Sequence, residues 1–171
     1  VVQHITPSFT ESFAKSLDTN CQLSVQVGRD GVCPEPGNVY IAPGDRHMLL
    51  TKSGTDYVIA LADHDRVNRH RPSVDELFKS VAVHAGQRGT GILLTGMGVD
   101  GAVGLKMIRE SGGRTFVQDE ASSVVFGMPR AAVELDAADT VLGIDRIAEC
   151  LTRYVFRNSE ADKRRRRGDS I

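Results

Sequence analysis

The chain has 171 residues, of which 40% are hydrophobic, and its formal net charge is −1. This length fits one globular domain, because a domain of about 150 residues buries roughly 70% of its unfolded surface. Residues 163–167 carry five positive charges, so the rest of the chain is acidic and we expect no nucleic-acid partner. We therefore predict a domain at 1–157 and a basic, disordered tail at 158–171.

Three cysteines, Cys21, Cys33 and Cys150, are odd in number and lack C-x-x-C spacing. This pattern argues against a disulfide framework and a cysteine-rich zinc site, so a cytoplasmic location is expected. No apolar run approaches the roughly 20 residues that span a bilayer, and no signal peptide is apparent. The sequence starts inside an apolar run at Val1, so we expect a fragment of a longer protein.

The first half of the chain predicts one helix and several short strands. Residues 1–3 have the composition of a strand end, and Thr6-Pro7 is typical of a helix start. The stripe of Phe9, Phe13 and Leu17 predicts the buried face of that helix. Four β-rich runs follow between turn signals, and the last two predict a hairpin: 23–27, 38–41, 48–51 and 57–61.

In the second half, strands and helices alternate. Ser73 and Glu76 have the spacing of a capping box, which predicts a helix to about Ala85 with Val74, Leu77, Phe78 and Val81 inward. A strand at 92–94 precedes a helix with Val103, Leu105, Met107 and Ile108 buried, which ends at Gly112-Gly113. The remaining predicted elements are a strand at 115–118, a helix at 130–135, a strand at 140–142 and a helix at 145–157.

This alternation predicts an α/β fold. We expect a doubly wound, mainly parallel sheet with helices on both faces, in three α/β/α layers, and a small antiparallel hairpin. Functional groups of such folds gather at the carboxyl ends of strands. His4 and Asp100 each follow a predicted strand, so they are expected at that edge.

His4 and Asp100 could form the base and orienting carboxylate of a hydrolase. A carboxylate that binds the Nδ1 proton of an imidazole fixes its tautomer and stabilises the imidazolium. Two plainer interpretations remain open. An aspartate after a glycine turn often caps a helix, and a histidine after a strand is often only a satisfied polar group.

Residues 96–101 offer a rival interpretation, since they have G-x-G-x-x-G spacing before a helix, where backbone N–H groups attract phosphate. Asp100 would point negative charge at such a ligand. A second cluster, residues 68–73, has two arginines and a histidine that suit a carboxylate or phosphate, or else form a solvated loop. His47, His64 and His84 lack metal-ligand spacing and are interpreted as structural, so no metal or other cofactor is expected.

A nucleophile is not evident. No serine lies in a G-x-S-x-G sequence. Ser73 is explained by its capping position, and Ser122 and Ser123 lie in a loop that could equally pack under the site.

Five stretches together resemble one family, the catalytic domain of the chemotaxis protein-glutamate methylesterase, CheB. They are residues 3–10, 40–47, 68–75, 94–102 and 118–129. The resemblance implies a serine hydrolase that removes methyl esters from glutamates on the cytoplasmic helices of methylated chemoreceptors, with deamidation of glutamines there as a second expected activity. It also implies a receiver domain in the same or a partner chain as regulator.

On this resemblance, His4 and Asp100 match the catalytic histidine and aspartate, and the backbone N–H of Met97 matches an oxyanion-hole position. His70 matches a histidine close to the site. Val99 stands where family members commonly have asparagine. The family's serine follows a preceding strand, so we expect the nucleophile and that strand upstream of this chain, which alone should be inactive. The alternatives are a non-catalytic regulatory or receptor-binding module and a nucleotide-binding domain.

Overall fold

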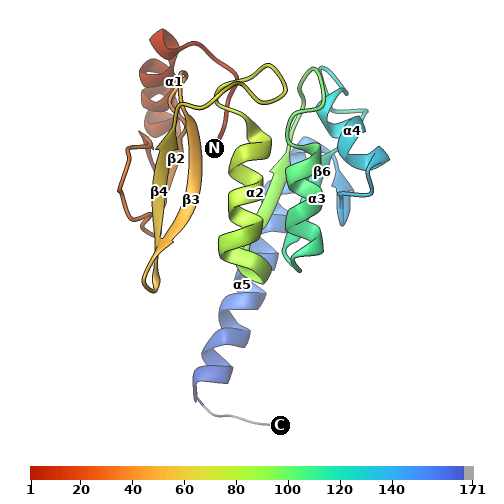
Figure 1. Cartoon of the computed structure of the whole chain (residues 1–171). Helices are drawn as coiled ribbons and strands as arrows, with labels where there is room; N and C mark the ends of the chain where they lie inside the picture. The colour runs from red at the N-terminus through yellow and green to blue at the C-terminus, as the bar shows by residue number, and fades with distance from the viewer. Residues whose placement is uncertain (168–171) are drawn as a thin grey trace.

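The structure is a computed structural model that describes residues 1–167, and it has the predicted three-layer α/β/α arrangement (Figure 1). The first half holds one helix and four strands: α1 (Pro7–Asn20), β1 (Ser24–Val27), β2 (Asn38–Ile41), β3 (His47–Ser53) and β4 (Asp56–Ala62). The second half holds the remaining elements: α2 (Val74–Ala85), the 3₁₀ turn η1 (Gly86–Arg88), β5 (Thr90–Leu93), α3 (Ala102–Glu110), β6 (Arg114–Gln118), α4 (Met128–Glu134), β7 (Thr140–Leu142) and α5 (Ile144–Arg167).

The parallel strands form two groups. β1 pairs with β2, and β5, β6 and β7 form a three-stranded parallel sheet. β3 and β4 form the predicted antiparallel hairpin. In Figure 1 the β3–β4 hairpin lies beside β2, and the N-terminus lies between this hairpin and α2.

The predicted strand at 1–3 is not assigned as one. Val1 nevertheless lies beside β2, because its carbonyl accepts the N–H of Ala42 at 2.8 Å. Val2 packs against both the core under the hairpin and the core of the β5–β7 sheet. This short segment, which leads directly to His4, therefore connects the two halves.

The helix predictions differ from the structure at three places. Phe9 is 64% exposed, whereas Phe13 and Leu17 pack as predicted against the core beside the buried Ala14, so the prediction is wrong only at Phe9. Val103 is exposed, while Leu105 and Ile108 of the same helix are fully buried. Helix α5 runs to Arg167, well past the predicted end at 157, and extends away from the rest of the chain (Figure 1). Residues 168–171 of the predicted tail lie outside the described residues.

Helices α2 and α3 lie side by side at the centre of the molecule and pack closely (Figure 1). A Cβ added to Gly104 of α3 would lie 2.6 Å from the Cβ of Phe78 and 2.9 Å from the carbonyl oxygen of Asp75. Because nothing larger than glycine fits there, the first turns of the two helices are held in direct contact. The loop that carries His70 leads into the first turn of α2, and the loop that carries Met97 and Asp100 leads into the first turn of α3.

Replacing Gly104 by alanine should therefore destabilise the domain, although alanine ordinarily favours a helix. We expect the free energy of unfolding to fall by about 1–3 kcal/mol because the clash with α2 requires the helices to separate. Urea denaturation measures this change. Lys106→Ala, on the outer face of α3, is the matched control and should change stability little; equal effects of both variants would contradict the packing argument.

Candidate active site

His4 and Asp100 form the pair predicted from the sequence. The Nε2 atom of His4 lies 2.8 Å from Oδ2 of Asp100, although the residues are 96 positions apart. His4 comes from the segment before α1, and Asp100 from the loop between β5 and α3. The carboxylate is fully buried, whereas the imidazole side chain remains 21% exposed. The imidazole of His4 is thus accessible from the surface, and the buried carboxylate of Asp100 binds its inner side.

Asp100 accepts several further hydrogen bonds. Its donors besides His4 are the hydroxyl of Ser73 at 2.6 Å, the side-chain amide of Asn68 at 2.9 Å, and the backbone N–H of Val74 at 2.7 Å. Burial on its own would raise the pKa of Asp100, but the hydrogen bonds from His4, Ser73, Asn68 and Val74 hold this pKa well below its usual range. The buried carboxylate is therefore ionised at neutral pH.

The ionised carboxylate determines the tautomer of His4. Because Asp100 can only accept, His4 must carry a proton on Nε2 and donate it. We expected the carboxylate to bind Nδ1, and that expectation is wrong. Nδ1 is left as the basic nitrogen, and among the described residues none is hydrogen-bonded to it. A proton taken up at Nδ1 would be stabilised by the charge of Asp100 across the ring.

The capping role of Asp100 is real but concerns a different helix from the expected one. It accepts N–H groups from Val74 and Asp75, in the first turn of α2, and makes no side-chain cap for α3. The predicted capping box is wrong, since Ser73 makes no side-chain cap and donates its hydroxyl to Asp100 instead. Glu76 binds His64 and Lys79. Asp100 therefore serves as both cap and imidazole partner.

His70 stacks on the imidazole of His4. The ring centroids are 3.7 Å apart and the planes differ by 6°. Burial is the main cause that lowers the pKa of His70, and the nearby charge of His4 lowers it further, while Asp100 opposes this. A neutral His70 beside His4 can restrict rotation of the ring without competing for the proton. Sequence reasoning alone left the role of His70 open.

A second histidine pair, His47 and His64, contacts the segment before α2 that carries Ser73. His47 is fully buried and stacks on His64 at 4.3 Å. Its Nδ1 accepts the backbone N–H of Ser73 at 3.2 Å, and its Nε2 lies 3.1 Å from the carbonyl of Asp65. Burial lowers the pKa of His47 and so favours the neutral form that these bonds require. The structural interpretation of these two residues agrees with these contacts.

The basic cluster at 68–73 does not form a joint ligand site. Arg71 donates to the carbonyls of Asp63 and His64, at 2.6 and 3.1 Å, and so stabilises its own loop. Arg69 is exposed, with φ 70°. The useful residues of this segment are instead His70 and Asn68.

The glycine-rich loop at 96–101 does not offer a phosphate site. The start of α3 is occupied by a carboxylate of the chain itself, because Oδ1 of Asp75 accepts the N–H of Gly104 at 2.7 Å. Met97 is 80% exposed at the tip of this loop. Its backbone N–H has no hydrogen-bond acceptor among the described residues, so its oxyanion role stays a prediction.

No serine in the described residues lies within hydrogen-bond distance of the His4 ring. Ser73 is fully buried and faces Asp100 rather than His4. Ser122 and Ser123 hydrogen-bond to Asp119 in the loop after β6. The three serines considered from the sequence are thus structural.

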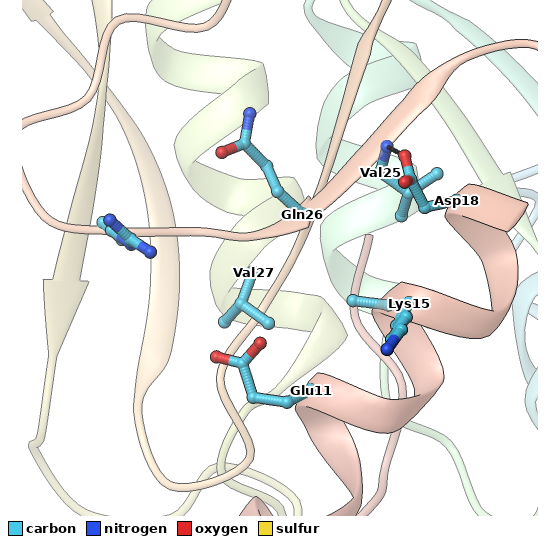
Figure 2. Close-up of a pocket in the computed structure, with 8 residues that line it drawn as sticks. Glu11, Lys15, Asp18, Val25, Gln26 and Val27 are labelled. Carbon is cyan, nitrogen blue, oxygen red and sulfur yellow. Dashed lines mark hydrogen bonds between the residues drawn. The ribbon is translucent and has the colours of Figure 1, made fainter.

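Two surface depressions lie away from this pair. Figure 2 shows one of about 210 Å³ between α1 and β1, where Glu11, Lys15 and Asp18 bring mixed charges. Asp18 is engaged with the strand edge, since its carboxylate accepts the N–H of Val25 at 2.7 Å. The other depression, between β6 and α5, is lined by Phe116 and Tyr154. Neither of these two depressions is lined by His4 or Asp100.

Comparison with known proteins identifies the family to which this chain belongs. A family model described as CheB methylesterase matches residues 1–151. This chain belongs to the CheB methylesterase family. It is 38% identical to the CheB methylesterase catalytic domain of Thermotoga maritima, with a TM-score of 0.88 over 90% of this chain and 82% of that one.

Curated relatives carry the name protein-glutamate methylesterase/protein-glutamine glutaminase. One from Photorhabdus laumondii is 51% identical over 149 residues, which cover 87% of this chain and 43% of that protein. One from Salmonella typhimurium is 49% identical over 149 residues, with the same coverage. The chain thus spans about two fifths of the length of these relatives. The structure contains no helix that is long and apolar enough to cross a membrane among the residues searched.

Asp100 should contribute to stability in a pH-dependent way. Its folded pKa is depressed, so its contribution is present above the unfolded carboxyl pKa of about 3.9 and is lost progressively as the pH falls toward the folded value. Asp100→Asn should remove about 2–3 kcal/mol at pH 7, because an amide leaves several buried donors poorly satisfied. The difference from the parent chain should shrink below pH 4.

Urea denaturation between pH 3 and 7 measures this difference. Asp56→Asn, an exposed aspartate at the tip of the β3–β4 hairpin, is the matched control. A penalty for Asp100→Asn that stays constant across this range would show that the charge of Asp100 does not stabilise the fold.

Proposed function

We propose that the protein to which this chain belongs hydrolyses glutamate methyl esters on the cytoplasmic helices of methylated chemoreceptors, and that it also deamidates glutamines there. The hydrogen bond between His4 Nε2 and the buried, ionised Asp100 carries this proposal. It is the base-and-orienter half of a serine hydrolase site in a chain of the CheB family. The names of the relatives supply the substrate class.

The proposed reaction begins at the free nitrogen of His4. Nδ1 takes the proton of a serine hydroxyl as the serine oxygen attacks the ester carbonyl, and Asp100 stabilises the resulting imidazolium. His4 then returns the proton to the leaving methanol, and an acyl-enzyme remains. Water, deprotonated by His4 in turn, hydrolyses this ester and releases the glutamate carboxylate and the serine. For a glutamine substrate, ammonia leaves in place of methanol.

The serine is proposed to come from outside this chain, because no described serine reaches His4. Met97 is proposed to supply one donor for the tetrahedral oxyanion through its backbone N–H, which no described acceptor occupies. His70 is proposed to hold the His4 ring by stacking. The imidazole of His4 is partly exposed, which leaves it accessible to a side chain of another protein.

The partners and location follow from this function. The proposed substrate is a methyl-accepting chemotaxis protein, and a receiver domain in the same or a partner chain is the proposed regulator. Such a substrate presents its helices in the cytoplasm, where we place this protein. No cofactor takes part in the proposed reaction.

Methanol release from a methylated receptor tests the proposal. We expect no turnover by this chain alone and turnover by the longer protein that includes the upstream segment. In the longer protein, His4→Ala should lower kcat by about 10³- to 10⁴-fold or more, since the serine then lacks its base. Circular dichroism should show an unchanged fold for this variant, because His4 is partly exposed.

Three other results would contradict parts of this proposal. Turnover by the chain alone would overturn the external nucleophile. Receptor binding by the longer protein without any turnover would support a non-catalytic module. Full activity of His4→Ala would remove His4 from the mechanism. His84→Ala, which changes a histidine far from the pair in sequence at the end of α2, is the matched control and should retain activity.

A further inference from the structure

Asn68 occupies a tight turn that faces both members of the candidate pair. Val67 and His70 exchange backbone hydrogen bonds of 3.1 and 2.9 Å, and the two residues between them have φ of 52° and 70°. Such left-handed geometry suits asparagine. As a result, one turn directs Asn68 to Asp100 and His70 to His4.

The side-chain amide of Asn68 lies between two buried carboxylates. Its nitrogen donates to Oδ2 of Asp75 at 2.7 Å and to Oδ1 of Asp100 at 2.9 Å, so both of its protons are used. Asp75 and Asp100 are 3% and 0% exposed. Without the amide, two neighbouring negative charges would face each other in a buried region, which favours protonation of one of them.

Asp75 and Asp100 also cap each other's helices. Asp100, which precedes α3, accepts the N–H of Val74 at the start of α2. Asp75, in the first turn of α2, accepts the N–H of Gly104 in the first turn of α3. The position of Asp100 behind His4 therefore depends on the Asp75 cap, and the orientation of its carboxylate depends on the amide between them.

We propose that Asn68 and Asp75 are positioning residues for the hydrolytic reaction: the Asn68 amide bridges the Asp75 and Asp100 carboxylates, and so keeps Asp100 ionised with its second oxygen directed at His4. This inference rests on the proposed function. It assigns roles to Asn68 and Asp75, which the names of the related proteins do not describe. His70, which stacks on His4, is also acted on by the charge of Arg66.

Two variants of the longer, active protein test the inference: Asn68→Asp, and the exchange Asn68→Asp/Asp75→Asn. Asn68→Asp places a third carboxylate against Asp100. We expect kcat to fall about ten- to a hundredfold, because a misplaced or protonated Asp100 no longer orients His4, with KM nearly unchanged. The acid limb of the pH–rate profile should also move. Asn20→Asp, at the exposed end of α1, is the matched control and should leave all three quantities unchanged.

The exchange variant separates positioning from stability. Residue 75 as asparagine can still accept the Gly104 N–H with its oxygen and can donate its amide to the new aspartate at 68, so the α2–α3 contact and the net charge are kept. Asp100, however, still loses its amide donor. We expect the free energy of unfolding to recover relative to Asn68→Asp while kcat stays low. Recovery of kcat together with stability would overturn the positioning role.

A readout on the present chain keeps this test independent of activity. The imidazole ¹H and ¹⁵N resonances of His4, followed by NMR against pH, report its bond to Asp100 without any nucleophile. They should change in Asn68→Asp and in the exchange variant, and not in Asn20→Asp. If the longer protein proves inactive but these resonances change, the proposed function fails and the coupling stands. If they do not change, the coupling itself is wrong.

Discussion

The buried carboxylate of Asp100 is the constraint on which the centre of this molecule depends. It gathers donors from the N-terminal segment and from residues 68–75, which are far apart in the sequence. A charge in the interior is costly unless hydrogen bonds compensate it, so the loss of any one donor weakens the placement of the others. The cluster that stabilises the junction of α2 and α3 is therefore the same cluster that orients His4. A substitution of Asp100 is therefore expected to change both the stability of this junction and the orientation of His4.

Much of this fold could be predicted from local sequence. The hairpin, the start of α2 at Ser73 and Val74, and β7 follow from turn residues and hydrophobic periodicity, which act over a few positions. The pairing of His4 with Asp100 could also be predicted, because Asp100 follows the parallel strand β5 and His4 follows a segment that runs beside β2. The family resemblance added their proposed roles and that of Met97, and it placed His70 close to the site without a role.

The rest depends on contacts between distant segments. Ser73 and Glu76 have capping-box spacing, yet this local cap does not form. Instead, tertiary packing places the charged carboxylate of Asp100 where it accepts the hydroxyl of Ser73 and the N–H of Val74. Phe9 lies on the helical stripe predicted to be buried, but α1 turns Ala14 toward β1 and β2 instead, and Phe9 remains exposed. Nothing local distinguishes Asn68 as a bridge, since one acceptor comes from α2 and the other from the loop before α3. The bond of His4 through Nε2 rather than Nδ1 likewise reflects the direction from which the ring approaches, which only the backbone path defines.

The mutual capping of α2 and α3 couples assembly of the site to folding. Neither helix start is satisfied until the other has docked, so the amide protons of Val74 and Gly104 lose protection from solvent exchange in a single opening event. A chain that is only partly folded, as during synthesis on the ribosome, lacks the carboxylate behind His4 and so carries no oriented base. The oriented imidazole of His4 then forms in one step with the native core, and a misfolded copy of the chain lacks it.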